Sequence, residues 1–426
     1  MPDRIAIQPR GPLRATVRPP GSKSITNRAL ICAALAEGPS LLTGALDSDD
    51  TRVMIDSLRR LGIRLRFAPE ASLIEMEGCG GKWPAATANL FIGNSGTSIR
   101  FLTAALATGS GIFRLDGVER MRQRPIGDLI DTLRALGADA FSETNNGCPP
   151  VVLHANGLTG RKAAVRGDIS SQFLSGLLMA LPYARNDVDL SVTGTLVSQP
   201  YVTMTLGVMR SFGVNARTEG LSEFHFQARQ RYRGRAYEIE PDASAASYFW
   251  GAAAITGGEI TVRGLTRQAL QGDVAFCECL ARMGCEVTYT DQGITVAGRA
   301  SRGITVDMNA ISDTVQTLGA IALFAEGPTT ITGVAHIRHK ETDRIGDLAR
   351  ELRKLGASVD EFEDGLRITP GVLHGAEIDT YDDHRMAMSL SLAGLQIPGV
   401  IIKDPGCTAK TYPRFFEDFQ SLPEKS

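Results

Sequence analysis

A five-residue motif that ends in glycine returns along the chain at an almost constant interval. LRRLG (58–62), LRALG (133–137), MRSFG (209–213), LARMG (280–284) and LRKLG (352–356) close on glycines that are 75, 76, 71 and 72 residues apart. Each copy has the composition of a basic amphipathic helix end with a C′ glycine, and a strand-like run such as IRLRF or CEVTYT follows it. Self-similarity at a fixed period indicates one supersecondary unit, repeated along the chain.

Two further sets of motifs keep the same interval. Short polar clusters precede a small-residue helix in each repeat: GSKS (21–24), GNSGTS (93–98), GDISSQ (167–172), PDASAAS (241–247), ISD (311–313) and YDDHR (381–385). Other motifs are expected to open a second helix: SDDTR (48–52), RPIGD (124–128), SQPYV (198–202), QGDV (271–274), KETDR (340–344) and KTYPR (410–414). The repeat is therefore predicted to be strand, helix, strand, helix and two strands, present six times.

Six such units favour two lobes of three. One more interval beyond Gly356 reaches the end of the chain, so the sixth unit lacks its trailing strand. The N-terminal segment RIAIQP…LRATVRP is predicted to supply that strand, which would make the array cyclic.

Composition restricts the class of protein. With 426 residues, 43% hydrophobic and 22% charged, the chain is expected to be a soluble α/β protein with two domains. A net charge of −2 and an isoelectric point near 6.3 argue against nucleic acid as a partner. Seven scattered cysteines without a CxxC pair predict neither a metal site nor a disulfide framework and fit the cytoplasm. The N-terminus lacks an apolar targeting region, and no run is long enough to span a membrane.

The periodic helix starts carry most of the unusual residues. A helix N-terminus offers free N–H donors and a partial positive charge, so it readily binds anions. The basic residues at or near these starts are Lys23, Arg28, Arg100, Arg120, Arg122, Arg124, Lys340, Arg344, Arg385 and Lys410. If symmetry directs these ends into one cleft between the lobes, the cleft suits a strongly anionic substrate. Asp313 and Glu341 lie among these cations, and proton transfer is the expected reason.

Simpler interpretations stay open at this point. Small polar residues cap helices in any α/β protein, and single arginines in such motifs are often solvated surface charges. A P-loop nucleotide site is a further alternative, but GPLRATVRPPGSKS lacks the GxxxxGK[ST] spacing. A non-catalytic scaffold built from the repeat would not need acids among its arginines.

Nine motifs taken together resemble the EPSP synthase (3-phosphoshikimate 1-carboxyvinyltransferase) family. They are PPGSKSITNRAL, GNSGTSIRFL, RMRQRPIGDL, GDISSQFLSGLL, LVSQPYVTMT, DASAASYF, HKETDRI, YDDHRMAM and DPGCTAKTYPRFF, in order from about residue 8 to 420. The resemblance implies an α/β, two-lobed enolpyruvyl-transferase fold of six βαβαββ units, with helix N-termini facing the cleft. One lobe would be residues 21–239 and the other residues 1–20 plus 240–426, because the chain crosses between them twice.

The family reaction transfers the enolpyruvyl group of phosphoenolpyruvate to the 5-hydroxyl of shikimate 3-phosphate and releases phosphate. It passes through a tetrahedral intermediate and needs no metal or organic cofactor. The resemblance also implies that the lobes close when shikimate 3-phosphate binds. Because only small-molecule substrates are implied, the protein is expected to be a monomer, and its cysteine usage predicts the cytoplasm.

Roles follow from the matching positions. Residues that match the shikimate 3-phosphate contacts are Lys23, Ser24, Arg28, Ser170, Ser171, Gln172, Ser198, Tyr201, Asp313 and Lys340. Those that match the phosphoenolpyruvate contacts are Lys23, Asn94, Gly96, Arg124, Gln172, Glu341, Arg344, His384, Arg385 and Lys410. Asp313 matches the favoured general base and Glu341 the acid/base at the methylene carbon. Lys23 and Lys410 are the other candidates for moving protons.

Two positions depart from the family pattern. His336 stands where many members have an asparagine that contacts the shikimate moiety, and Phe101 stands where proline is common. Gly96 is retained, so room for glyphosate is expected, with competition against phosphoenolpyruvate as the measurable consequence.

Two enzymes of related fold are the nearest alternatives. The enolpyruvyl transferase that uses UDP-N-acetylglucosamine typically has a lysine–asparagine pair and a loop with a reactive cysteine. Here Ser24 follows Lys23, and the corresponding loop, ERMRQRP, contains no cysteine. An RNA 3′-phosphate cyclase would need a nucleotide site and a histidine nucleophile, and the chain has no such histidine motif.

Overall fold

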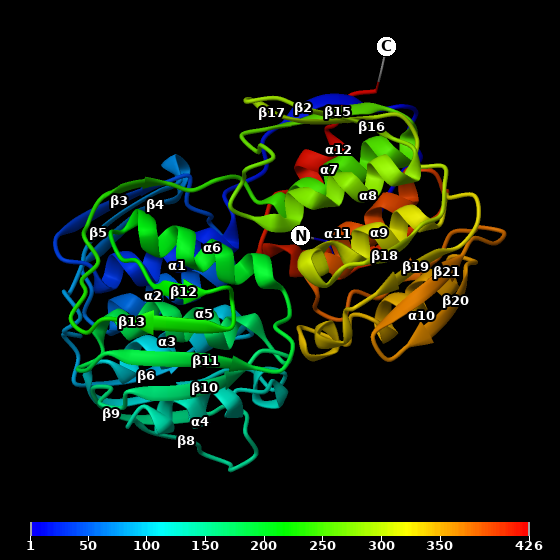
Figure 1. The fold of residues 1–426 in the computed structure, drawn as a ribbon. Helices are drawn as coiled ribbons and strands as arrows, with labels where there is room; N and C mark the ends of the chain where they lie inside the picture. Colours follow the sequence, from blue (N-terminus) through cyan, green and yellow to red (C-terminus); the bar gives the residue numbers. More distant parts are fainter. Residues whose placement is uncertain (1, 425–426) are drawn as a thin grey trace. The chain divides into compact units, whose positions relative to one another are not determined.

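The computed structural model describes residues 2–424 and divides the chain into two compact units. The contiguous unit is Gly21–Ile239, and the split unit combines Met1–Pro20 with Glu240–Ser426. The chain therefore passes between the units twice (Figure 1). None of the described helices is long and apolar enough to cross a membrane.

Three four-stranded sheets of one topology build the contiguous unit. Their orders are β14 (Ala236–Glu238), β3 (Pro39–Thr43), β5 (Leu73–Glu77), β4 (Leu65–Ala68); β6 (Thr87–Phe91), β7 (Ser110–Asp116), β9 (Val151–Asn156), β8 (Asp139–Ser142); and β10 (Lys162–Arg166), β11 (Val188–Thr193), β13 (Glu223–Phe226), β12 (Arg217–Glu219). In each sheet the first pair is parallel and the other two pairs are antiparallel. Three repeats of the predicted unit are thus present here.

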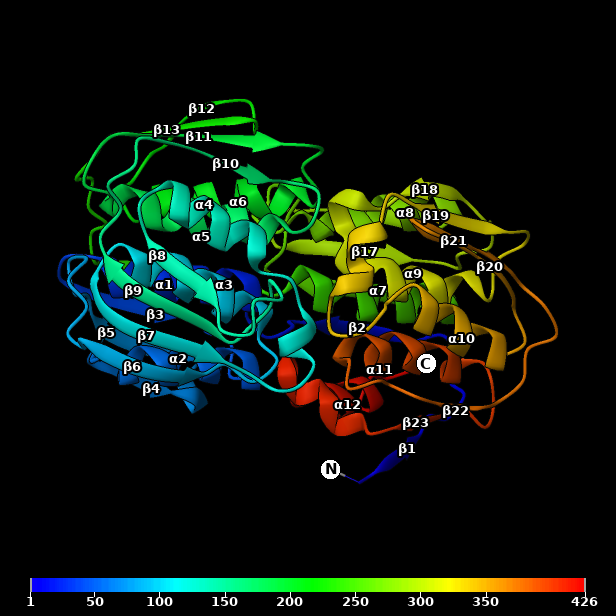
Figure 2. The same ribbon diagram turned by 90° about the horizontal axis from the view of Figure 1, so that it is seen from below.

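Helices of two kinds accompany these sheets. The inner helices α1 (Lys23–Leu35), α3 (Gly96–Ala107) and α5 (Ser171–Ala180) are buried along nearly their whole length. The outer helices α2 (Asp49–Arg60), α4 (Gly127–Ala135) and α6 (Gln199–Ser211) expose one face. Figure 2 shows the sheet of β10 to β13 with α4, α5 and α6 beside it. Short 3₁₀ turns are η1 (Pro69–Ala71), η2 (Met121–Gln123) and η3 (Leu181–Tyr183).

The split unit repeats this plan with one change. Its sheets are β2 (Arg14–Val17), β15 (Glu259–Arg263), β17 (Gly293–Ala297), β16 (Glu286–Tyr289); β18 (Thr305–Asp307), β19 (Thr329–Thr332), β21 (Gly365–Thr369), β20 (Ser358–Phe362); and β22 (Glu377–Ile378), β23 (Ile401–Lys403), β1 (Arg4–Ala6). The last sheet has three strands, and the N-terminal β1 pairs antiparallel with β23. This pairing confirms the prediction that the N-terminus completes the sixth unit.

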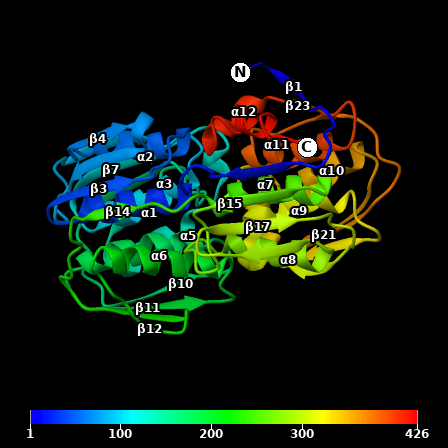
Figure 3. The same ribbon diagram turned by 90° about the horizontal axis from the view of Figure 1, so that it is seen from above.

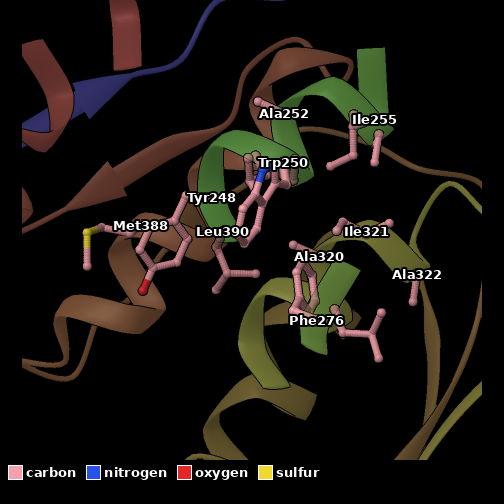
Figure 4. Packing of buried hydrophobic residues seen from close by; sticks show 14 of the residues in the cluster. Tyr248, Trp250, Ala252, Ile255, Phe276, Ala320, Ile321, Ala322, Met388 and Leu390 are labelled. Carbon is pink, nitrogen blue, oxygen red and sulfur yellow. The ribbon is translucent and has the colours of Figure 1, made fainter. Parts of the chain in front are cut away.

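The inner helices of the split unit are α7 (Ala243–Thr256), α9 (Val315–Ala322) and α11 (His384–Ser391). Figure 3 shows α7 beside β15, and Figure 4 shows Trp250 of α7 among side chains from α9 and α11, such as Ile321 and Leu390. The outer helices are α8 (Phe276–Met283), α10 (Gly346–Lys354) and α12 (Phe415–Gln420). The 3₁₀ turns are η4 (Gly272–Ala275), η5 (Asn309–Thr314), η6 (Ala335–His339), η7 (Leu392–Leu395) and η8 (Pro405–Lys410).

The glycines of the repeated five-residue motif end helices as predicted. Their φ angles are +86°, +92°, +88°, +114° and +99° in chain order, from Gly62 to Gly356. This left-handed conformation costs glycine little, and it turns the chain from each helix into the next segment.

Two predicted helix starts were wrong by several residues. Lys340 follows η6, and Lys410 ends η8, so neither lies in the first turn of an α-helix. Helix α10 begins later because the Asp343 carboxylate accepts the N–H groups of Ile345 and Gly346 and so caps it there. Pro413 delays α12, since the residue before a proline disfavours helical angles.

Candidate active site

Asp313 is the centre of an ion-pair cluster in the split unit. One carboxylate oxygen accepts Lys340 Nζ at 2.6 Å and Arg344 Nη1 at 3.3 Å, and the other accepts Arg385 Nη2 at 2.7 Å. The three cations come from the segment before α10 and from the first turn of α11. Predicted residues from two successive repeats, the fifth and the sixth, therefore meet at one carboxylate.

Glu341 is the second acid of this cluster. Its oxygens lie 2.8 Å from Arg344 Nη2 and 3.1 Å from Lys410 Nζ, and its side chain is 8% exposed. Lys410 reaches Glu341 from η8, so a fourth segment contributes. The cluster thus holds two nearly buried carboxylates against four cations.

Asp383 has a role that the sequence did not predict. Its fully buried carboxylate accepts Arg344 Nε at 2.7 Å and Nη2 at 3.2 Å, and it also caps α11 by accepting the N–H of Arg385 at 2.8 Å. A two-bonded arginine–carboxylate pair fixes the guanidinium plane as well as its position. The YDDHR motif contains this residue, and its second aspartate was the available signal.

Arg385 makes one contact that links α11 to α7. Its Nη1 lies 3.4 Å from the hydroxyl of Tyr248, a buried residue of α7. Burial raises the pKa of Tyr248 to about 12, against the opposing effect of Arg385, so the phenol stays neutral at physiological pH. Tyr248 is a second neighbour of the cluster that the sequence did not predict.

Burial and charge act in opposite directions on the central ion pairs. Burial alone raises the pKa of Asp313, but Arg385, Lys340 and Arg344 together hold it well below its usual range. Burial lowers the pKa of Lys340, although Asp313 opposes this effect. In the absence of substrate, Asp313 is therefore an ionised but weakly basic carboxylate.

Two histidines lie in or beside this cluster. His336 on η6 is buried, and its burial together with Lys340 lowers its pKa to about 3, although Asp313 acts to raise it. Its imidazole is therefore neutral. His384 is also buried, with its Nδ1 3.6 Å from Asp383.

The contiguous unit places Lys23 at the start of α1. Ser22 caps this helix by accepting the N–H of Ile25, as the GSKS cluster predicted. The Lys23 ammonium lies 4.0 Å from Asp50, whose buried carboxylate also accepts Asn27 Nδ2 at 3.3 Å. Asp50 lies in the SDDTR motif but was not assigned a role by sequence, and it restrains the lysine at the helix start.

Arg124 and Gly96 are fitted to each other. Arg124 Nη1 donates to the backbone and side-chain oxygens of Asn94 at 3.1 and 3.2 Å. A Cβ atom at Gly96 would lie 2.4 Å from Arg124 Nη2 and 3.0 Å from Arg100 Nη1. The missing side chain at position 96 therefore makes room for two guanidinium groups at the start of α3.

Gln172 joins α5 to this arginine group. Its Oε1 accepts Arg100 Nη1 at 2.5 Å, and its Nε2 donates to Thr97 at 3.3 Å. Ser170 caps α5 by accepting the N–H of Gln172, and Ser171 opens the helix. Arg100 was only one of ten candidate cations in the sequence, whereas the structure assigns it this specific partner.

Arg28 is directed into the protein interior. It is 1% exposed and donates to Thr205, Ser24, Ser175 and Tyr201 at 2.7 to 3.2 Å, and its guanidinium also lies over the rings of Phe101 and Tyr201. Burial lowers its pKa to about 10, so it remains a cation. Its direct contact with a substrate stays a prediction.

Ser198 and Tyr201 begin α6 near this arginine. Ser198 has a φ of +51°, a strained value for serine, and its side chain does not cap the helix.

Two cations predicted near the helix starts have partners in their own segment: Arg122 binds Asp116 at 2.8 Å, and Arg120 lies 3.4 Å from Gln123. Among the described residues, no group of three or more His, Cys, Asp or Glu is arranged to hold a metal ion.

Comparison with known proteins shows the family. The sequence model of EPSP synthase (3-phosphoshikimate 1-carboxyvinyltransferase) matches residues 7–419. The chain belongs to the EPSP synthase family. A 3-phosphoshikimate 1-carboxyvinyltransferase of Nostoc punctiforme is 49% identical over 415 residues, 97% of each chain, and one of a Shewanella strain is 46% identical over 98% of this chain and 99% of its own.

A solved EPSP synthase from Acinetobacter baumannii has the same fold. It superposes with a TM-score of 0.81 at 27% identity and covers 99% of this chain and 98% of its own. As a member of the EPSP synthase family, the protein is a transferase of the shikimate pathway that acts on phosphoenolpyruvate and shikimate 3-phosphate. The alternative reaction with UDP-N-acetylglucosamine is not favoured.

Proposed function

We propose that Asp313 and Glu341 perform the proton transfers of this reaction. The observation that carries the proposal is their placement: both carboxylates are nearly buried, and both contact Arg344 within one cluster of four cations. General acid–base catalysis needs titratable groups held in place beside the reacting atoms. Two anionic substrates need the surrounding positive charge.

The proposed steps conserve atoms and charge. Asp313 takes the proton of the 5-hydroxyl of shikimate 3-phosphate while the hydroxyl oxygen attacks C2 of phosphoenolpyruvate. Glu341 in its protonated form gives a proton to the C3 methylene, which becomes a methyl group. In the second step the C2–O bond to phosphate breaks, the leaving phosphate takes up the proton that Asp313 received, and a proton from the methyl group returns to Glu341, so both carboxyl groups regain their starting states.

Substrate binding would make Asp313 a better base. Arg385, Lys340 and Arg344 hold the pKa of this carboxylate low. When the anionic groups of phosphoenolpyruvate bind Arg344 and Arg385, they offset part of that positive charge, so the pKa of Asp313 rises toward the range of an effective base. The three carboxylate partners of Arg344 must loosen for this contact to form.

Residues of the contiguous unit are proposed to bind shikimate 3-phosphate, the acceptor, and to contribute some of the residues that bind phosphoenolpyruvate. Ser24, Ser170, Ser171, Ser198 and Tyr201, with Lys340 of the split unit, would bind shikimate 3-phosphate. Lys23, Asn94, Gly96, Arg124 and Gln172 would bind phosphoenolpyruvate together with Glu341, Arg344, His384, Arg385 and Lys410. The Arg100–Gln172 and Arg124–Asn94 hydrogen bonds support this assignment because they hold two of the proposed substrate-binding side chains in place before substrate binds.

The test measures phosphate release with both substrates and with each alone. Release requires both, and Asp313→Asn and Glu341→Gln each lower kcat by at least about a hundredfold. Lys23→Ala abolishes turnover, yet shikimate 3-phosphate still binds. Phosphate release from phosphoenolpyruvate with UDP-N-acetylglucosamine, or full activity of both acid variants, would contradict the proposal.

We also propose that the enzyme acts as a cytoplasmic monomer without a cofactor. Seven cysteines, all free in the structure, fit a reducing compartment. Sedimentation at assay concentration measures the oligomeric state, and activity that survives exhaustive chelation measures metal independence.

A further inference from the structure

The turn before α11 has an unusual residue at its centre. The Asp383 N–H donates to the Thr380 carbonyl at 2.9 Å, which closes a four-residue turn. Both central residues have positive φ, +55° at Tyr381 and +53° at Asp382. Such turns normally contain glycine, asparagine or aspartate at these positions, and a bulky side chain there is an outlier. Tyrosine at position 381 therefore carries a conformational cost.

The Tyr381 side chain makes contacts that offset this cost. Its hydroxyl donates to Glu351 Oε1 at 2.5 Å, and Glu351 is a completely buried residue of α10. The Arg350 guanidinium lies over the tyrosine ring at 5.6 Å, and its Nη1 donates to the hydroxyl at 3.2 Å. Burial and the hydrogen bond to Glu351 raise the pKa of Tyr381 to about 12, so the hydroxyl remains a donor at neutral pH.

Helix α10 connects this tyrosine to the segment of Glu341. Arg350 also donates to Asp347 at 2.5 Å, and Asp347 accepts the hydroxyl of Thr342, the residue after Glu341. Glu351 in addition accepts the N–H of Asp379, just before the turn. The turn and the Glu341 segment are thus attached to the same two turns of one helix.

The turn is followed directly by residues that hold the two arginines proposed to bind phosphoenolpyruvate. Asp383 closes it, holds Arg344 by two hydrogen bonds and caps the helix on which Arg385 lies. We propose that Tyr381 is a positioning residue: by holding the strained turn against α10, it sets Arg344 and Arg385 for phosphoenolpyruvate. This inference rests on the proposed roles of those two arginines.

The test is Tyr381→Phe, which removes one hydroxyl and leaves the ring. The KM for phosphoenolpyruvate is expected to rise about tenfold, while the KM for shikimate 3-phosphate changes by less than about twofold. Tyr289→Phe is the matched control, because Tyr289 in the same unit also lies under an arginine, Arg267, at 4.2 Å. Equal kinetics of the two variants, or parallel loss of both substrates' affinities with loss of folded protein, would overturn the inference.

A second variant separates the effect of the strained backbone conformation from the effect of the phenol contacts. Tyr381→Asn suits positive φ better but has no phenol, so its melting temperature should hold while its KM for phosphoenolpyruvate rises as in the phenylalanine variant. An unchanged KM in this variant would also overturn the inference.

Arg385→Gln distinguishes failure of this inference from failure of the proposed function. A raised KM for phosphoenolpyruvate in Arg385→Gln with a silent Tyr381→Phe refutes the positioning role alone. An unchanged KM in Arg385→Gln refutes the assignment of Arg385 and the inference that depends on it.

Discussion

Gly96 is a residue of the candidate site whose identity is restricted by its neighbours. Its missing Cβ leaves space for Arg124 and Arg100, two side chains held by hydrogen bonds to Asn94 and Gln172. An alanine methyl group would lie 2.4 Å from Arg124 Nη2, and a guanidinium fixed by two hydrogen bonds cannot yield without losing them. The sequence pattern marked this glycine, but its reason is steric and belongs to the folded site.

Gly96→Ala is therefore expected to raise the KM for phosphoenolpyruvate about tenfold, equivalent to about 1.4 kcal/mol of binding energy. Steady-state kinetics with shikimate 3-phosphate saturating provide the measurement. Gly127→Ala is the control, because a Cβ there would meet its nearest neighbour at 3.5 Å, an ordinary contact. Equal KM values for the two variants would show that Arg124 adjusts freely.

His336 predicts a pH dependence of stability. Burial lowers its pKa to about 3 in the folded protein, whereas an unfolded histidine titrates near 6.5. Below about pH 6.5 the unfolded chain binds a proton that the folded chain does not, so this residue destabilises the fold as pH falls toward 3. The neighbouring Lys340 and Arg344 favour the neutral ring, and Asp313 opposes them.

His336→Asn should remove this loss of stability at low pH. Between pH 7 and pH 5 the wild type is expected to lose about 2 kcal/mol more stability than the variant. Denaturation curves at the two pH values measure the difference, with His374→Asn, an exposed histidine of the same unit, as the control. A wild type and His336→Asn variant with parallel pH dependence would refute the buried, neutral state.

At the scale of elements, Arg28 joins three helices of the contiguous unit. It starts from α1 and donates to Ser175 of α5 and to Tyr201 and Thr205 of α6. These acceptors are buried, so each one left without its donor costs free energy. The guanidinium fork is what allows one residue to reach all of them.

Arg28→Lys is expected to lower stability by about 2 kcal/mol, because an ammonium group cannot reach partners on two other helices at once. Thermal melting measures this loss, and Arg60→Lys at the exposed end of α2 is the matched control. A melting temperature of Arg28→Lys equal to that of the control would mean that the buried acceptors on α5 and α6 do not need the guanidinium group.

At the scale of the whole molecule, the repeat closes through the N-terminus. Strand β1 supplies the antiparallel partner of β23 that the sixth repeat lacks, and Ile7 beyond it is buried in the core. The split unit therefore depends on two segments from opposite ends of the chain.

Deleting residues 2–6 removes β1 and leaves β23 with one partner strand. Compared with the full-length enzyme, the truncated variant is expected to exchange the amide hydrogens of Ile401–Lys403 at least about tenfold faster, because the amides that bonded to β1 become exposed. Strand β13 of the contiguous unit serves as the internal control. Unchanged protection of β23 would show that β1 contributes nothing to the sheet.

The sequence by itself determined the period of the fold, its element types and several of the helix starts, such as those at Ser22 and Ser170. These features are local: a C′ glycine such as Gly62, a cap such as Ser22 and an amphipathic stripe each act within a few residues. The family motifs then predicted which of the polar residues take part in the reaction, and those roles stay a proposal.

Only the tertiary structure decided which charges pair and which turn inward. Arg344 binds Asp383, 39 residues away, and Arg28 turns to partners on other helices. Tyr381 occupies a turn that its own conformational preference disfavours, because its hydroxyl finds Glu351. Such choices depend on distance and on loss of solvent, and these quantities arise only when segments from different repeats pack together.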